Sequence, residues 1–234
     1  QNKLDDFASV RDFGAVGDGV TDDTVAINRA LYQLFCRESN EEVRRSLFFP
    51  AGIYLITGTI KIPPYAKLYG EGADSTIVRY TSSDGSTIDD YVVRTADSLQ
   101  QTGANIGNNG AIAPRNIEVS SMSFETTEDT QDVLLIEKLN QGYFDSVNLM
   151  GSLVEADLSD AADDTKTITV VSSTALPTTQ VTFDKCYITG ATYGFYTDYN
   201  TAGITLSNCT FYLLYRGVAL GAAIKIAIAH QQDV

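Results

Sequence analysis

The sequence predicts an all-β protein, a parallel β-helix (a solenoid of short stacked strands) with a capping α-helix near the N-terminus. Two observations lead to this fold: a pattern that repeats in register through the second half of the 234-residue chain, and an amphipathic helix that follows a glycine-rich loop. We expect residues 1–47 to form the N-terminal segment and helix. Residues 48–234 would form the coils, with excursions near 81–114 and 152–180.

The N-terminal loop and helix are predicted from residues 10–35. Asp18-Gly19 indicates a tight turn, because glycine adopts positive φ at little cost. Thr21 or Asp22 is the expected helix N-cap, where acidic side chains face the positive end of the helix dipole. Turn and capping chemistry accounts for these residues better than a metal or carboxylate cluster does. The apolar face that follows has helical spacing: Ile27, Ala30, Leu31, Leu34 and Phe35.

Four segments of the second half align: VSSMSF (119–124), FDSVNL (144–149), FDKCYI (183–188) and LSNCTF (206–211). In each segment the first, fourth and sixth residues are apolar, and the break in alternation indicates a corner between two sheets. The distance in sequence between equivalent residues of these segments gives each coil room for three short strands. The residue spacings of leucine-rich and hexapeptide repeats are absent from the sequence. A β-sandwich would not explain the register. The expected inward residues are Val119, Met122, Phe124, Phe144, Val147, Leu149, Phe183, Cys186, Ile188, Leu206, Cys209 and Phe211.

The last segment, IKIAIAH (224–230), reads as the start of another coil. An open solenoid end exposes unpaired strand edges, which invites aggregation. We therefore expect the coils to be incomplete at the C-terminus, so that the native protein continues beyond Val234 or neighbouring subunits cover this end.

Residues 8–80, with GDG-x-TDDT and PAG-x-Y, resemble the opening segment of the pectate-lyase-like right-handed parallel β-helix proteins, and most closely bacteriophage tailspike and tail-fibre proteins. The resemblance implies that the N-terminal segment covers one end of the solenoid. It further implies a homotrimer that meets other phage tail proteins and engages a host cell-surface polysaccharide, often cleaving it by hydrolysis or elimination. The corresponding location is the virion tail, outside the cell.

Composition excludes several functions. The net charge of −14, from 30 acidic and 16 basic residues, argues against nucleic acid and against anionic membranes as partners. The sequence contains no apolar run long enough to span a membrane, no phosphate-binding glycine loop and no zinc-ligand spacing. We therefore expect no cofactor, no metal and no membrane insertion. Cys186 and Cys209 are expected to be small buried apolar residues on successive coils.

Carboxylates are the remaining candidates for catalysis. Asp145 and Asp184 align on adjacent coils at roughly the 5 Å spacing used by retaining glycosidases, and close like charges raise one pKa. The alternative is that both carboxylates bind the corner backbone and that Lys185 neutralises them. Asp198 is a weaker catalytic candidate. His230, the single histidine, reads as incidental.

Aromatic and basic side chains near Asp198 are the candidates for sugar binding. Tyr193, Tyr196 and Tyr199 could present ring faces to sugars, and Arg216 could hold an acidic sugar. The Asn-Thr-Asp, Asp-pair and Gly-His-Gly motifs of polygalacturonases and the calcium clusters of pectate lyases are not recognisable, which argues against plant-type pectin activity.

The sequence thus favours a bacteriophage tailspike or tail-fibre β-helix domain that binds host surface polysaccharide, and leaves its depolymerisation open. One alternative is a secreted bacterial polysaccharide lyase or glycoside hydrolase. The other is a structural component of the virion tail without a sugar site.

Overall fold

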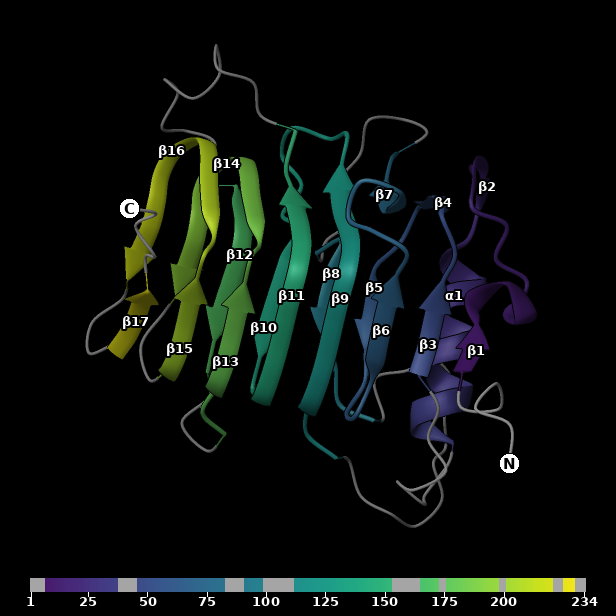
Figure 1. Cartoon of the computed structure of the whole chain (residues 1–234), viewed down its shortest axis with the longest axis horizontal. Helices are drawn as coiled ribbons and strands as arrows, with labels where there is room; N and C mark the ends of the chain where they lie inside the picture. The colour runs from purple at the N-terminus through teal and green to yellow at the C-terminus, as the bar shows by residue number, and fades with distance from the viewer. Residues whose placement is uncertain are drawn as a thin grey trace.

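The computed structural model describes residues 7–37, 46–82, 91–98, 112–152, 165–172, 176–197, 201–220 and 225–229. Within these ranges every strand pairs in parallel with strands of the neighbouring coils, and the chain winds as a right-handed parallel β-helix (Figure 1). The predicted all-β solenoid is confirmed. Its strands form three faces.

The first face is the longest and carries the N-terminal strand at one end. Its strands are β1 (Phe7–Ser9), β3 (Ser46–Phe49), β6 (Lys67–Gly70), the start of β9 (Arg115–Thr126), the start of β11 (Asn140–Met150), β13 (Thr179–Asp184), β15 (Ala202–Ser207) and β17 (Lys225–Ala229).

The second face contains β2 (Asp18–Asp22), β4 (Gly52–Ile56), β7 (Thr76–Tyr80), the ends of β9 and β11, and the starts of β14 (Tyr187–Thr197) and β16 (Thr210–Leu220). The third face contains β5 (Ile60–Ile62), β8 (Val93–Thr95), β10 (Leu134–Glu137), β12 (Lys166–Val171) and the ends of β14 and β16.

The repeat predicted from the sequence sets the register of the coils. Val119 pairs with Phe144, and Phe144 pairs with Phe183 on the next coil. The Phe144 and Phe183 rings stack with centroids 4.8 Å apart and both are fully buried, so the core repeats the strand spacing. Cys209 and Phe211, on the last predicted coil, are only partly buried against this core.

The predicted corner between two faces is confirmed by the backbone. Ser121, Ser146, Lys185 and Asn208, which occupy the same position in the four segments, all adopt positive φ between 53° and 55°. This left-handed conformation bends each strand from the first face onto the second. It explains the break in apolar alternation, because the bend shifts which side chains point inward.

The N-terminal helix α1 (Thr24–Leu31) lies against the coil end that carries β1 (Figure 1). A 3₁₀ helix η2 (Val10–Phe13) precedes it and a π-helical turn η3 (Tyr32–Cys36) extends it. The expected apolar face is confirmed, since Ile27, Ala30, Leu31 and Phe35 are buried and Leu34 packs against the core.

The helix N-cap differs from the sequence prediction. Asp23 occupies that position, one residue after the predicted Asp22. The Asp23 carboxylate is fully buried and accepts hydrogen bonds from the backbone amides of Val16 and Gly17, at 2.7 and 2.9 Å. Asp22 instead accepts from the Thr24 amide and hydroxyl. Asp23 thus holds the preceding loop and Asp22 holds the first turn of the helix, so neither acts as a simple cap.

Each of the two predicted excursions contains a described strand. β8 lies within residues 81–114 and pairs with β5 and β10, while β12 lies within 152–180 and pairs with β10 and β14. β8 alternates buried and partly exposed residues, and β12 is rich in β-branched residues, as is typical of strands. Through their pairing both strands belong to the third face. β17, in the predicted final coil start, pairs with β15.

Candidate functional site

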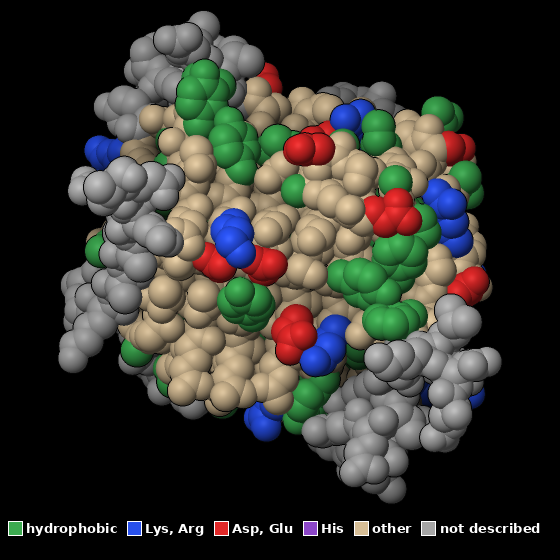
Figure 2. Space-filling model, viewed as in Figure 1, with side chains coloured by type: hydrophobic (Ala, Val, Ile, Leu, Met, Phe, Trp, Pro, Cys, Tyr) green, Lys and Arg blue, Asp and Glu red, His purple; other side chains and the backbone are tan. Residues whose placement is uncertain are grey.

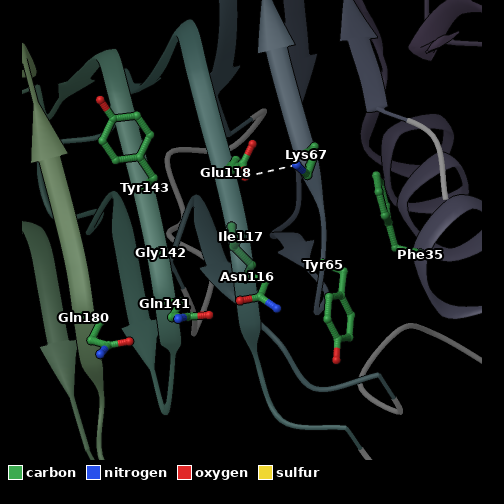
Figure 3. Close-up of a pocket in the computed structure, with 10 residues that line it drawn as sticks. All are labelled: Phe35, Tyr65, Lys67, Asn116, Ile117, Glu118, Gln141, Gly142, Tyr143 and Gln180. Atoms are coloured by element: carbon green, nitrogen blue, oxygen red, sulfur yellow. Dashed lines mark ion pairs between the residues drawn. The ribbon is translucent and has the colours of Figure 1, made fainter. Parts of the chain in front are cut away.

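A groove of about 630 Å³ crosses the first face where β6, β9, β11 and β13 begin (Figure 3). Phe35 of η3 bounds it on the side of the capping helix, as Figure 3 shows. Three side-chain amides and two tyrosines are among its other lining residues. The lining residues are Phe35, Tyr65, Lys67, Asn116, Ile117, Glu118, Gln141, Gly142, Tyr143 and Gln180.

The amides of the groove come from one position in successive coils. Each of these amides lies three residues before the first inward residue of a repeat: Asn116, Gln141 and Gln180. The residues that flank them pair in register with their counterparts on the neighbouring coil. All three have positive φ, between 51° and 66°. Residues other than glycine rarely adopt this backbone conformation, and among them asparagine adopts it most readily. The strands are spaced by about 4.8 Å, which sets the repeat of the amides.

The groove has aromatic and charged side chains beside its amides. Tyr143 is 44% exposed on β11, between its register partners Glu118 and Thr182. Lys67 pairs with Glu118 at 3.1 Å, and both side chains are about half exposed (Figure 3). Because this pair is neutral as a whole, the groove offers hydrogen bonds and ring faces instead of a net charge.

These groups suit a ligand rich in hydroxyls. A primary amide both donates and accepts hydrogen bonds, as a sugar hydroxyl does. A tyrosine ring presents an apolar face to the C–H side of a sugar and keeps a polar tip in water.

The predicted catalytic pair lies on the same face. Asp145 and Asp184 are register partners on β11 and β13, one residue before the corner. Asp145 follows Tyr143 by two residues, so both side chains point outward, roughly 7 Å apart along the strand. Figure 2 shows acidic and basic side chains dispersed over this side of the molecule, some of them next to a side chain of opposite sign.

The electrostatics of this pair differ from those of a carboxylic acid catalyst. The Asn208 amide donates to Asp184 at 3.0 Å, and this hydrogen bond lowers the pKa of Asp184 below its usual value. The two carboxylates raise the pKa of Lys185, whose ammonium lies between them. Asp184 is therefore ionised at neutral pH. Lys185 lies near both carboxylates, as the predicted alternative has it, but the described hydrogen bond of Asp184 comes from the Asn208 side chain and not from the corner backbone.

The predicted sugar-binding residues lie on a different face. Tyr193 and Tyr196 of β14 and Arg216 of β16 come together on the third face, and Lys166 of β12 joins them. Asp198 and Tyr199 fall outside the described residues, as does His230. The structure thus separates the predicted binding residues from the predicted catalytic pair.

The groove residues are absent from the sequence prediction, although the repeat contained a signal for them. Extending each repeat three residues toward the N-terminus aligns Asn116, Gln141, Gln180 and Gly203. Asparagine and glycine at one position of a repeat indicate positive φ. Among the residues that the structure describes, no group of three or more histidine, cysteine or acidic side chains could hold a metal ion. No helix in those ranges is long and apolar enough to cross a membrane.

Comparisons with known proteins agree with the fold. A glucan 1,3-beta-glucosidase of Cochliobolus carbonum is 43% identical over 65 residues, which cover 28% of this chain and 8% of the relative. A pre-neck appendage protein of Bacillus phage B103 is 29% identical over 117 residues, covering 50% of this chain and 11% of the relative. The chain thus spans about a tenth of the length of these relatives.

A solved structure extends the likeness to the whole chain. Tailspike protein 3 of bacteriophage CBA120 aligns with 99% of this chain and 35% of its own, at a TM-score of 0.57 and 14% identity. This likeness concerns the fold. The model of the family described as "rhamnogalacturonase A/epimerase, pectate lyase-like" matches residues 7–219. Since that match spans most of the chain, the protein belongs to the rhamnogalacturonase A/epimerase, pectate lyase-like family.

Proposed function

We propose that this chain is a β-helix domain of a bacteriophage tail protein and that its groove on the first face binds a surface polysaccharide of the host cell. The observation that carries the proposal is the column of Asn116, Gln141 and Gln180 amides beside Tyr65 and Tyr143. The likeness to phage appendage and tailspike proteins supports the phage origin.

The geometry of the groove favours an extended glycan over a compact ligand. Equivalent amides recur on successive coils, so a chain of sugars that lies along the solenoid axis meets the same hydrogen-bonding groups again. The strands fix the spacing of these groups before binding, which reduces the entropy lost on association. We further propose that the assembled protein is a homotrimer, which would multiply weak contacts with a repetitive surface.

Retention on immobilised glycan tests this proposal. Surface polysaccharides from candidate host bacteria would be coupled to a resin, and the domain's dissociation constant would be measured for each. Gln141→Gly and Gln180→Gly remove the amides without straining the backbone, because Gly203 occupies the same column with a φ of 67°. At about 0.5–1.5 kcal/mol for each lost hydrogen bond, the double variant should bind roughly tenfold more weakly.

Ser146→Gly is the matched control. Ser146 also has positive φ on β11 but lies at the corner and does not line the groove. The control should bind like the parent domain. An equal loss of affinity in the double variant and in the control would contradict the proposal. So would a parent domain that is retained by none of the polysaccharides. Light scattering of the same samples would test the trimer.

Cleavage is a separate proposal that involves Asp145, Asp184 and Asp198. The first two lie beyond Tyr143 on the groove's own face, so a glycan that leaves the groove along β11 would reach them. Sizing the bound polysaccharide after incubation would detect cleavage. Shortened products from the parent and intact glycan from Asp145→Asn and Asp184→Asn would support these catalytic roles, whereas unchanged cleavage by both variants would exclude them.

A second function is favoured by one comparison. The match to the Cochliobolus carbonum glucan 1,3-beta-glucosidase supports a secreted glucan-acting enzyme. Release of sugars from a soluble β-1,3-glucan by a monomeric domain would favour this function over the phage tail.

A further inference from the structure

A hollow of about 460 Å³ lies on the second face, beside the turn between β6 and β7. It is separate from the groove, since the two share no lining residue. Residues of the turn and of strands β7, β9, β11 and β14 line it. They include Asp74 from the turn and Ile77, Asn148, Met150 and Tyr187 from the strands.

The turn beside the hollow is held in place by hydrogen bonds. The Gly72 carbonyl accepts from the backbone amides of Ser75 and Thr76, at 3.1 and 2.8 Å. The hydroxyl of Ser123, a fully buried residue of β9 on the next coil, donates to the Ala73 carbonyl. The shape of the hollow is therefore set before a ligand binds, which reduces the entropy lost on association.

The polar groups of the hollow are mainly hydrogen-bond acceptors. The Asn148 side-chain amide donates to Asp74 Oδ1 at 3.3 Å. Asp74 Oδ2 and the Asn148 side-chain carbonyl accept no hydrogen bond from the described residues, and the exposed Asp74 forms no ion pair with them. Glu125, the register partner of Met150, pairs with Arg79, so those two charges offset each other. The hollow thus offers a negative charge and acceptor oxygens to a ligand that carries donors and a positive charge.

Apolar surface lies next to this carboxylate. Ile77, Met150 and Tyr187 are each partly exposed, and each directly precedes or follows a buried residue of the core, so they stand on the outer side of the coils. The Tyr187 ring stacks on that of Tyr212, with centroids 6.4 Å apart and planes at 29°. Tyr212 is 55% exposed, so the apolar surface continues beyond the hollow. Tyrosine and methionine are enriched in the contacts between proteins.

A lysine side chain combines an apolar four-carbon stem with an ammonium group that donates three hydrogen bonds. Its stem fits the surface of Ile77 and Met150, and its ammonium fits Asp74 and the ring face of Tyr187. The exposed Tyr212 would contact residues next to the lysine in a polypeptide, which a free amine does not have. We propose that this hollow is a docking site for a lysine side chain of a partner polypeptide. The proposal stands whether or not the groove binds glycan.

The two methionines of the chain allow a specific test. Met150 lines the hollow, whereas Met122 is fully buried in the core. NMR of isotope-labelled methionine methyl groups gives one signal for each, and Met150→Leu assigns them. The probes are acetyl-Leu-Lys-Leu amide and the same peptide acetylated on the lysine ammonium. The first should shift the Met150 signal to saturation and leave Met122 unchanged. The second should bind at least tenfold more weakly, because it lacks the charge.

Substitutions then assign the binding to the hollow. Asp74→Asn keeps the shape of the side chain but removes its charge, and it should weaken binding of the unmodified peptide by about tenfold. Glu71→Gln is the matched control, because Glu71 is an exposed residue of the same turn and does not line the hollow. Tyr212→Ala should weaken binding of the peptide and leave binding of butylamine unchanged.

Three results would overturn the proposal. Equal shifts of the Met150 signal by the two peptides, or no shift at all, would show that the hollow does not recognise the ammonium. A loss of affinity in Asp74→Asn no larger than in Glu71→Gln would exclude the carboxylate as its partner. Butylamine that bound as tightly as the peptide would assign the hollow to free amines. The groove variant with Gln141→Gly and Gln180→Gly should bind the peptide like the parent, which keeps the two sites distinguishable.

Discussion

Asp145 and Asp184 occupy the same position on adjacent coils, and one ammonium group lies between their carboxylates. Lys185 Nζ is 3.7 Å from Asp145 Oδ1 and 3.4 Å from Asp184 Oδ2. Asp145 Oδ1 is buried and accepts no hydrogen bond from the described residues. Its interaction with Lys185 is therefore electrostatic attraction without a hydrogen bond. Parallel register would otherwise place two like charges side by side, and Lys185 offsets that repulsion.

The directions of the pKa shifts define the pH range over which Asp184 and Lys185 stabilise the fold. The lowered pKa of Asp184 adds stability above its unfolded value of 3.8, and that stability is lost as pH falls through the lowered folded value. The raised pKa of Lys185 adds stability below its unfolded value of 10.5, and it is lost as pH rises through the raised folded value. The full contribution therefore spans the range between these two unfolded values.

We predict that Lys185→Met destabilises the protein more at pH 7 than in acid. The substitution leaves Asp145 and Asp184 as adjacent carboxylates, which repel each other when ionised and much less when protonated. Melting temperatures of parent and variant would be compared at pH 7 and at about pH 2, well below the usual carboxyl pKa. Lys185→Arg keeps the charge and should show a smaller change. A melting-temperature difference independent of pH would contradict the electrostatic role.

We predict that Asp23→Ala destabilises the protein by roughly 2–4 kcal/mol, since it leaves two amides without an acceptor. Those amides belong to Val16 and Gly17 in the loop that leads to α1. Denaturant unfolding would measure the loss. Asp18→Ala is the comparison, because the exposed Asp18 carboxylate accepts hydrogen bonds from the Val20 and Thr21 amides, which water can satisfy after the substitution. An equal loss in both variants would show that burial of Asp23 is not the cause.

We predict that Phe183→Ala costs roughly 3–5 kcal/mol of stability and that Phe183→Leu costs much less. The Phe183 ring stacks on Phe144 and meets Phe195 edge to face, 6.2 Å away. All three rings are fully buried, so alanine leaves a cavity between coils, whereas leucine fills most of the space. Unfolding of the two variants in denaturant gives both free energies. Similar losses for alanine and leucine would mean that ring stacking, and not volume, determines the stability here.

Periodic apolar residues allowed the coils to be predicted from the sequence. The inward residues Val119, Phe144 and Phe183 recur at one position of the repeat, and parallel coils must place equivalent positions next to each other. The corner was predictable for the same reason. The helix cap was displaced by one residue, because the sequence does not show that Asp23 turns away from the helix to bind the preceding loop.

The groove and the hollow depend on information that the repeat does not carry. The groove needs the positive φ of Gln141 and Gln180, a conformation that glutamine does not signal. The hollow needs Asp74, which is 74 residues before Asn148 and lies in a turn outside the repeat. Only the winding of the chain places that carboxylate beside the amide of Asn148.

We predict that Cys209 reacts with iodoacetamide before Cys186. These thiols occupy equivalent positions on successive coils, and both are free. A hydrogen bond from the Cys186 thiol lowers the pKa of Cys209 to about 7, while the same contact and burial raise the pKa of Cys186. The thiolate is the reactive form, so the fast labelling rate should reach half its maximum near pH 7. Mass spectrometry of peptides from briefly labelled protein would identify the modified residue. Cys209→Ser should remove the fast phase, and a fast phase that survives in this variant would show that another thiol carries it.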